Sequence, residues 1–436
     1  MAKTEEFETG HHDRVTVLSI NFNGTRILTA SIDHRIKVWD RNPKTGERML
    51  TDTFTAHDSD IRDAKFLHPT TGSHIATIGS DLKFHLWTED MSQAPNRGRR
   101  FRRIATIPST PRVPFVSMDI KTVDNVYTTL ALIDRQGLLS IYEPTNPDDF
   151  KEWTLVDVFD VCGSNPPGRG EETSFKVRWD QNPTPLAYVN SLSDDRNQLS
   201  LVVSVLNEVK IYRSVVPNGD VGAGIASNGA SHRIIFYEAA RLPRHPSLVR
   251  DVQWAPFSVR GTDRIATACK DGAVRIFELG VTEGPNENLN GQSGNTDPSS
   301  TSSTSRSMPP SQRQQQQSSL TSAIIGRAHQ ISSNSPALSA SISAPSRSAR
   351  TGHTFPFSTT IQSSTLLSNA HSDAWSLSFD GQGQVLMSNG SDGVTKLWRK
   401  SVLGGQWLVF AGQEVLDADE ETDGEDRDED GEGDSD

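Results

Sequence analysis

Apolar and polar residues alternate in short stretches along most of this chain. The pattern is clearest between residues 15 and 39, in VTVLSINF, RILTASI and RIKVW. Alternation with a period of two places successive side chains on opposite faces of an extended strand. Turn-forming residues separate these stretches, and no long stretch repeats its apolar residues with the helical period. The pattern therefore predicts an all-β fold over residues 12–412.

One spacing recurs along the chain. An aspartate precedes a tryptophan by six residues in IDHRIKVW, SDLKFHLW and SDGVTKLW, which end at Trp39, Trp87 and Trp398. The aspartate suits a tight turn, and the alternating residues after it lead to an aromatic side chain that can pack inside a sheet. Self-similarity of this kind predicts an array of similar supersecondary units. Six such units can be aligned, at residues 12–40, 57–87, 114–143, 174–213, 245–279 and 371–398.

Charge and composition restrict the class of protein. The chain has 436 residues and a net charge of −12, yet residues 414–436 alone contain fourteen acidic residues and one arginine. The rest of the chain is therefore close to neutral, at about +1. Cys162 and Cys269 are too few for a disulfide framework, which favours a reducing compartment. No apolar stretch approaches the roughly 18 residues of a membrane-spanning helix, and the N-terminus lacks a signal peptide's apolar segment, so we expect no membrane insertion.

Several segments depart from the strand pattern. Residues 281–353 are rich in Ser, Gln, Asn and Pro, so we expect a disordered insert within the fifth unit that is a candidate for phosphorylation. The acidic residues 413–436 should be disordered through charge repulsion, and serve either solubility or a basic partner. Residues 217–231 read as a glycine-rich flexible loop. The folded parts are then residues 1–280 and 354–412.

An arginine-rich stretch allows two interpretations. Residues 91–103 contain five arginines around Phe101. They form either a nucleic-acid-binding or nuclear-targeting patch, or a solvated loop that leads into a strand at Phe101. We adopt the loop and expect no direct contact with nucleic acid.

These units resemble the WD40 repeat, in which one repeat forms a four-stranded blade of a β-propeller. In that family a histidine that opens the repeat and a hydroxyl residue link the aspartate to the tryptophan. We call this set the blade staple. The resemblance implies complete staples at His12, Thr29, Asp33 and Trp39, at His57, Thr77, Asp81 and Trp87, and at His371, Ser388, Asp392 and Trp398.

The middle blades depart from this set. The fifth blade keeps Asp271 but ends in Phe277, and the third and fourth blades end in Tyr142 and Tyr212. Their staples should be partial or missing.

The number of repeats has a structural consequence. Six units are found and not a seventh, and GGQWLVFAG at 404–412 suits a fourth strand for the last blade. Because only about eleven residues precede the first repeat, we expect the ring to stay open. Its first and last blades would then expose strand edges that can accept strands from a partner.

Within the WD40 family the chain resembles the Seh-type nucleoporins, siblings of the small propeller of the outer COPII coat. The resemblance rests on the order of four features: the turn in FLHPTTGSHIATIGSD (66–81), the link YEPTNPDDFKEWTLV (142–156), the polar SLSDDRNQLSL (191–201), and KDGAVRIFEL (270–279) followed by a variable insert.

This resemblance implies a specific role. It predicts an open six-bladed scaffold propeller in the Y-shaped complex of the nuclear pore, at the nuclear envelope. An α-helical scaffold nucleoporin would close the ring by donating a blade in trans, next to other Y-complex subunits, and the assembly would support mRNA export and protein transport. It also implies a second residence in a coat-like complex at the periphery of the vacuole or lysosome, which regulates a nutrient-sensing growth kinase.

Other functions are compatible with a propeller, because function resides in sites and not in a fold. The chain could be a COPII outer-coat propeller, or an adaptor that binds peptides on the top face of a closed ring. A propeller enzyme would need a convergent polar cluster in the central channel. The motifs H-E-x-x-H, C-x-x-C and G-x-S-x-G do not occur, so we predict no catalytic, cofactor-binding or metal-binding residues and no enzyme activity.

Overall fold

The computed structural model describes residues 7–414 except for 68–70, 124–126, 164–165, 169, 183–198, 216–233, 257–261, 284–356 and 402–404. The described residues all belong to the unit made of residues 1–286 and 345–436. Most of the predicted insert and acidic tail, and the glycine-rich segment, fall outside the described residues. What the sequence predicts for them stays a prediction.

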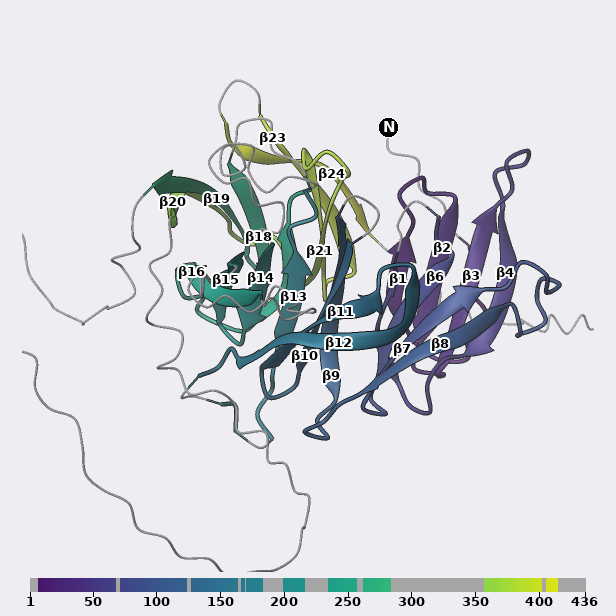
Figure 1. Cartoon of the computed structure of the whole chain (residues 1–436). Coiled ribbons are helices and arrows are strands. Elements are labelled where there is room, and N and C mark those ends of the chain that lie inside the picture. Colours follow the sequence, from purple (N-terminus) through teal and green to yellow (C-terminus); the bar gives the residue numbers. More distant parts are fainter. Residues whose placement is uncertain are drawn as a thin grey trace, which may run out of the picture. The chain divides into compact units, whose positions relative to one another are not determined.

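The described residues form 24 strands and no helix, so none of them forms a helix that could span a membrane. The strands pair into six four-stranded antiparallel sheets, each made of four strands consecutive in the chain (Figure 1). The first three sheets are β1 (Val15–Ile20), β2 (Arg26–Ser31), β3 (Arg35–Arg41) and β4 (Arg48–Thr55); β5 (Ile61–Phe66), β6 (His74–Gly79), β7 (Lys83–Glu89) and β8 (Phe101–Pro108); and β9 (Phe115–Val123), β10 (Tyr127–Asp134), β11 (Leu138–Asn146) and β12 (Asp149–Asp160).

The remaining sheets repeat this order. They are β13 (Phe175–Trp179), β14 (Ser200–Val205), β15 (Glu208–Val215) and β16 (Ile235–Arg241); β17 (Val249–Trp254), β18 (Asp263–Cys269), β19 (Val274–Glu283) and β20 (Phe357–Leu367); and β21 (Ala374–Phe379), β22 (Val385–Gly390), β23 (Val394–Lys400) and β24 (Trp407–Glu414). Each sheet is one blade. Blade five pairs β19 with β20 along its whole length, from Val274–Leu367 to Glu283–Phe357, across the predicted insert.

The tight turn between the second and third strands explains the recurring aspartate. In every blade this turn contains a residue with positive φ, between 56° and 89°. Glycine adopts such a φ without strain, whereas other residues are held there by their surroundings. The aspartate supports the turn by accepting the backbone N–H two residues further on, as Asp33 does from Arg35 at 2.9 Å. The positive-φ residues are His34, Leu82, Gly137, Leu206, Gly272 and Gly393.

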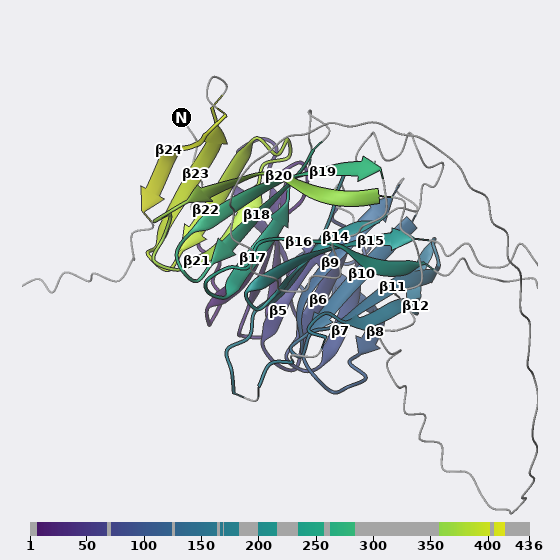
Figure 2. The same ribbon diagram turned by 90° about the vertical axis from the view of Figure 1, so that its left-hand side faces the viewer.

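Consecutive blades pack face to face (Figures 1 and 2). Their first strands, β1, β5, β9, β13, β17 and β21, contact one another in chain order, and no comparable contact joins β21 to β1 among the described strands. Five apolar cores fill the five junctions between consecutive blades. Blades one and two, for example, bury Leu28 and Ile36 against Ile75 and Trp87. The predicted all-β, six-bladed propeller is therefore confirmed.

Candidate interaction site and blade staples

The staple of blade two forms a continuous hydrogen-bonded chain. His57 Nδ1 lies 2.9 Å from Asp81 Oδ1, and its Nε2 lies 2.8 Å from Thr77 Oγ1. Trp87 Nε1 donates to the same hydroxyl at 3.1 Å. Because the carboxylate fixes the proton on Nδ1, the threonine hydroxyl donates to Nε2 and accepts from the indole. Hydrogen bonds thus join the histidine that opens the repeat to the threonine, the aspartate and the tryptophan near its end, inside the blade.

Blade six repeats this arrangement with serine in place of threonine. His371 contacts Asp392 at 3.0 Å and Ser388 Oγ at 2.7 Å, and Trp398 Nε1 donates to Ser388 at 2.8 Å.

In blade one the predicted histidine is wrong by one residue. His11, not His12, contacts Asp33 at 2.9 Å and Thr29 at 3.0 Å, while Trp39 Nε1 donates to Thr29 at 3.1 Å. His12 is exposed and contributes only its backbone N–H to Asp33, as Asp58 does to Asp81 in blade two. Burial alone would raise the pKa of Asp33, but the hydrogen bonds from His11 and from two backbone N–H groups hold this pKa below its ordinary value.

Blade five has a partial staple. His245 Nε2 lies 2.9 Å from Thr267 Oγ1, but Phe277 has no N–H to donate and packs in the core between blades four and five. Asp271 pairs with Arg275 at 2.5 Å and supports the turn by accepting the N–H of Ala273. Burial, followed by the charge of Arg275, lowers the pKa of His245 to about 4, so the imidazole is neutral.

A cluster of potential metal ligands coincides with the staple of blade two. One ligand atom each from His57, Asp81 and His85 lie within 4.8 Å of one another. Both ring nitrogens of His57 already take part in hydrogen bonds, and His85 Nδ1 lies 3.0 Å from Thr106 Oγ1. Burial, with the nearby charges of His57 and Arg103, lowers the pKa of His85 to about 4. The arrangement is that of a hydrogen-bonded blade interior, since no free pair of donors faces a common point.

The innermost strands carry a buried polar network that sequence reasoning missed. Lys65 of β5 contacts Asp119 of β9 at 2.6 Å, and Arg178 of β13 lies 3.6 Å from Asp251 of β17 and 4.0 Å from Asp63 of β5. No spacing along the chain could reveal it, because its members come from four blades. Each aspartate also accepts a backbone N–H from the following blade: Asp63 from Met118, Asp119 from Trp179 and Asp251 from Leu377.

A propeller enzyme would need a convergent polar cluster in its central channel, and this network is such a cluster. Its aspartates, however, already contact lysine or arginine side chains and accept backbone N–H groups. Carboxylates that neutralise cations and accept backbone N–H groups hold adjacent blades together. We interpret the network as a structural link between blades.

The arginine-rich stretch is tied to the body at several points. Asp52 accepts the backbone N–H groups of Gly98 and Arg100, and Arg100 Nε contacts Glu89 at 2.6 Å. Phe101 begins β8 and is buried in the core between blades one and two. These contacts describe a fixed loop that leads into a strand, as the sequence predicted.

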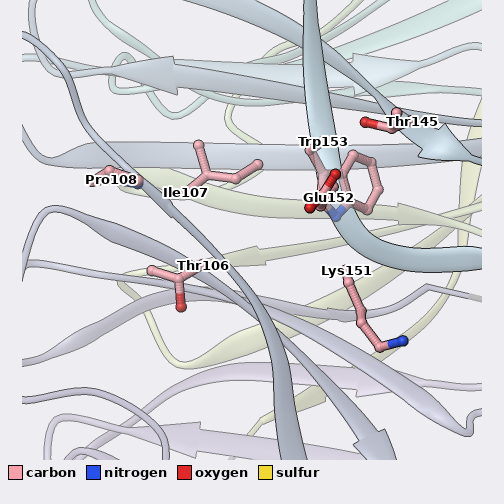
Figure 3. A pocket seen from close by; sticks show the side chains of 7 residues that line it. All are labelled: Thr106, Ile107, Pro108, Thr145, Lys151, Glu152 and Trp153. Carbon is pink, nitrogen blue, oxygen red and sulfur yellow. The ribbon is translucent and has the colours of Figure 1, made fainter.

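A shallow depression lies between the outer strands of blades two and three (Figure 3). Its volume is about 440 Å³, and it is lined by Thr106, Ile107 and Pro108 of β8, by Thr145 of β11, and by Lys151, Glu152 and Trp153 of β12. Trp153 Nε1 donates to the carbonyl of Phe150 and is satisfied within the chain. The depression has one apolar wall and offers no cluster of reactive groups.

Large apolar side chains are exposed on the first and last blades. On blade one, Leu18 and Ile20 of β1 and Phe22 just after it are 57%, 52% and 74% exposed. On blade six, Leu408 and Phe410 of β24 are 54% and 53% exposed. By contrast, the apolar residues of β5, which has blades on both sides, are buried. Blades three and five also expose large apolar side chains, at Tyr127, Leu155 and Leu366, but on the first strand of a blade the exposed pair Leu18 and Ile20 belongs to blade one, which lacks one neighbour.

The exposed Leu18 and Ile20 of blade one lie on its aromatic face, although the inner pair Ile27 and Trp39 of that face is itself buried. On blade two the cross-strand pair Ile75 and Trp87 is buried against blade one. The equivalent pair on blade one is Ile27 and Trp39, and Ile20 pairs with Ile27 on the same face. This face would contact a preceding blade if there were one.

On blade six, the face without a neighbour is the one opposite to its aromatic face. Leu386 and Trp398 pair across β22 and β23 and are buried against blade five. Arg399, the next residue, faces the other way and pairs with the exposed Leu408. In each junction between consecutive blades, the aromatic face of one blade packs against the opposite face of the blade before it. Blade one has its aromatic face at the gap and blade six has its opposite face there, so the two faces at the gap are of the two types that pack together.

The chain is similar in sequence to one described protein family and to several known proteins. The family described as WD domain, G-beta repeat, matches residues 3–40 and 362–399. Nucleoporin SEH1 of Chaetomium thermophilum is 34% identical over 359 residues, a match that covers 63% of this chain and 65% of that protein. Nucleoporin SEH1 of Saccharomyces cerevisiae is 30% identical over 275 residues, covering 63% and 70%. Nucleoporin SEH1 of Homo sapiens is 22% identical over 336 residues, covering 66% and 91%. The chain thus spans slightly less than two thirds of the Chaetomium relative.

Proposed function

This chain belongs to the SEH1 nucleoporin family, and from this premise we propose that it is a structural scaffold subunit of the nuclear pore complex. Its propeller is completed in trans by one blade from an α-helical scaffold nucleoporin. The assembly is the Y-shaped outer-ring complex at the nuclear envelope, and it supports mRNA export and protein transport. The same subunit also takes part in a vacuolar coat-like complex that regulates a growth kinase.

The observation that carries this proposal is the pair of uncovered blade faces. A single inserted blade would offer its aromatic face to Leu408 on blade six and its other face to Ile20 on blade one. Full burial of a large apolar side chain stabilises an interface by about 1.5–3 kcal/mol. Leu18, Ile20, Leu408 and Phe410 are each about half exposed, so covering them contributes about 1 kcal/mol each before ordering costs.

A scaffold role also agrees with the interior. The charged groups at the ring centre are paired with one another, and the histidines of the staples are bonded to hydroxyl groups. In the part of the chain that the structure describes, these contacts hold blades in place, and none of the side chains just named is arranged as an activated nucleophile or general base. We therefore propose that the protein is not an enzyme.

The test is purification of the tagged full-length chain at its native level, with identification of partners present in equal amounts. We expect an α-helical scaffold nucleoporin with other Y-complex subunits, and vacuolar coat subunits if the second residence holds. Recovery of COPII cage subunits, or of ubiquitin-ligase or histone-complex subunits without a scaffold nucleoporin, would refute the assignment.

Two charge variants locate the contact. Leu18→Glu and Leu408→Glu should each reduce recovery of the scaffold partner at least tenfold, because a charge would be buried in the new interface. Leu155→Glu is the matched control, since Leu155 is 46% exposed on β12 of blade three, away from both faces. Equal recovery with all three variants would show that the partner binds elsewhere.

A further inference from the structure

The loop between β7 and β8 projects from blade two and is attached to blade one. All of its residues from 91 to 99 are exposed. Three alternate backbone N–H groups hold it against β4, since Asn96 donates to a β4 carbonyl at 2.7 Å, and Gly98 and Arg100 donate to the carboxylate of Asp52 at 2.7 Å and 2.9 Å. These hydrogen bonds fix the position of the loop backbone relative to both blades.

Two arginines alternate with the attached residues. Arg97 and Arg99 are exposed, and in the described part of the chain neither forms an ion pair. Arg100, by contrast, contacts Glu89 at 2.6 Å. Guanidinium groups bind phosphate and carboxylate groups through paired hydrogen bonds, and a backbone that is already fixed reduces the ordering cost of binding. The loop therefore presents two guanidinium groups to an external anion.

Further cations surround these two on the outer rim of blades one and two. Arg103 of β8 pairs across the strands with Trp87, whose ring is buried against blade one, so Arg103 lies on the same side of β8. On blade one, Arg41 and Arg48 lie opposite each other at the ends of β3 and β4. Arg48 is about 10–13 Å along β4 from the residues that hold the loop, so side chains of both blades can contact one surface. The rim patch consists of Arg41, Lys44, Arg48, Arg97, Arg99 and Arg103.

The acids near the rim patch leave most of its charge uncompensated. Asp40 and Glu89 already pair with Arg26, each at 2.6 Å. Asp90 accepts the N–H and the hydroxyl of Ser92, and Glu47 is exposed in the turn that also contains Lys44. Outside residues 414–436 the chain is close to neutral. The rim patch is therefore a local concentration of positive charge.

Exposed apolar side chains accompany the cations. Met49 of β4 and Met91 of the loop are 56% and 72% exposed. Both are held at the rim, because Arg100 donates to Met91 Sδ at 3.3 Å and Asn42 donates to Met49 Sδ at 3.7 Å. A ligand that fits this surface offers anionic groups and an apolar region next to each other.

This combination distinguishes between classes of anionic ligand. A projecting loop whose residues are all exposed has no walls of its own to enclose a peptide. Residues 91–99 contain no aromatic ring on which a nucleic-acid base could stack, and a phosphate backbone offers methionine no apolar counterpart. The surface of an anionic bilayer offers both, since its phosphate and carboxylate groups lie directly above the acyl boundary.

We propose that the rim patch binds the surface of an anionic membrane. The guanidinium groups of Arg97 and Arg99 contact lipid phosphate and carboxylate groups, and Met91 lies at the level of the headgroups. The contact is peripheral and turns the rim of blades one and two toward the membrane. It uses neither blade six nor an inserted blade, so it is independent of the partner assigned above.

Flotation of the purified full-length chain with lipid vesicles tests the proposal without any scaffold partner. The bound fraction should be at least tenfold higher on phosphatidylcholine vesicles with about 30% phosphatidylserine than on phosphatidylcholine alone. It should fall when the salt is raised from about 0.1 M to about 0.5 M, because salt screens exposed charges. Equal binding to both kinds of vesicle, or binding to neither, would overturn the proposal.

A matched pair of double variants locates the contact. Arg97→Gln with Arg99→Gln should reduce partition onto the anionic vesicles about 25-fold, at about fivefold for each arginine near the surface. Arg112→Gln with Arg135→Gln is the control, since it changes the net charge equally and both arginines are exposed at blade three. An equal reduction by the two double variants would show that only the overall charge matters and would overturn the assignment to the rim patch.

A third variant separates a membrane from the other anionic ligands. Met91→Ser should reduce partition onto the anionic vesicles about threefold, because it removes apolar contact, and should leave binding of a short single-stranded oligonucleotide unchanged. Oligonucleotide binding that depends on Arg97 and Arg99, without a preference for anionic vesicles, would identify a nucleic-acid surface instead. Loss of a protein subunit from the purified complex in the Arg97 and Arg99 double variant, again without vesicle binding, would identify an acidic protein. Either result would overturn the proposal.

Discussion

Replacement of one staple hydroxyl should reveal how much a staple contributes to stability. In Thr77→Val the shape of the side chain is kept, but Trp87 Nε1–H and His57 Nε2 lose their shared partner at 3.1 Å and 2.8 Å. Both groups stay buried in blade two. A buried polar group without a partner costs about 1–3 kcal/mol, so we expect Thr77→Val to lower the free energy of unfolding by about 2–5 kcal/mol.

Blade five offers the matched comparison. Thr267 contacts His245 at 2.9 Å, but the aromatic residue there is Phe277, which has no N–H. Thr267→Val therefore leaves one buried group unsatisfied, and the expected loss is about 1–3 kcal/mol. The difference between the two variants measures the contribution of the indole N–H.

Urea unfolding at pH 7, followed by tryptophan fluorescence and circular dichroism, measures both variants against the wild type. Equal losses for Thr77→Val and Thr267→Val would refute the reasoning, because the indole hydrogen bond would then contribute nothing. A loss below about 0.5 kcal/mol for Thr77→Val would show that the staple is replaceable by packing alone.

Three further outcomes follow from the structure. Gly272→Ala should lower the free energy of unfolding by more than about 2 kcal/mol, measured by urea unfolding, because φ is +77° and the new Cβ would lie 2.0 Å from His371 O. His85 has a folded pKa of about 4 against 6.5 in the unfolded chain, so its stabilising contribution is present above pH 6.5 and is lost as pH falls toward 4. His85→Gln should therefore reduce the slope of unfolding free energy against pH in this window, by up to about 1.4 kcal/mol per pH unit. Lys65→Met should cost about 2 kcal/mol in thermal unfolding, less than a fully buried pair, because the Lys65 side chain is 23% exposed while Asp119 is 5% exposed.

Sequence reasoning recovers those parts of the fold that are encoded locally. Alternation, turn residues and the acid–aromatic spacing are all contained within one repeat, so they predicted the strands, while the histidine and the hydroxyl residue of each staple were implied by the resemblance to the WD40 repeat. The histidine is less well determined, since its distance to the aspartate is 24 residues in blade two and 21 in blade six. With two adjacent histidines in blade one, this variable spacing cannot distinguish His11 from His12. Gly10, which directly precedes His11, has a φ of +57°.

Features that join different blades could not be predicted in this way. Leu18, Ile20 and Phe22 alternate with Ser19 and Asn21, and this pattern correctly indicates a strand with one apolar face. Whether another blade covers that face depends on how the blades are arranged in the ring, and the sequence of the strand itself does not determine this. The same holds for the charged network at the ring centre, whose partners lie in different repeats. The sequence of each repeat thus specifies its own blade, while the exposure of the outer faces of blades one and six depends on how the blades are arranged in the ring.

The outer strands explain why this ring does not close on itself. A ring of six could close if the N-terminal segment paired with β23, but β24 already forms that ladder over its whole length. Displacing β24 would pull its first residue, Trp407, out of the core between blades five and six, where it is only 5% exposed. On the other side, Phe7 is held against Trp39 by the contacts of Lys37, so the segment stays with blade one. The gap between blades one and six is therefore bounded by an aromatic face on blade one and by the opposite kind of face on blade six, where β24 already holds the outer position.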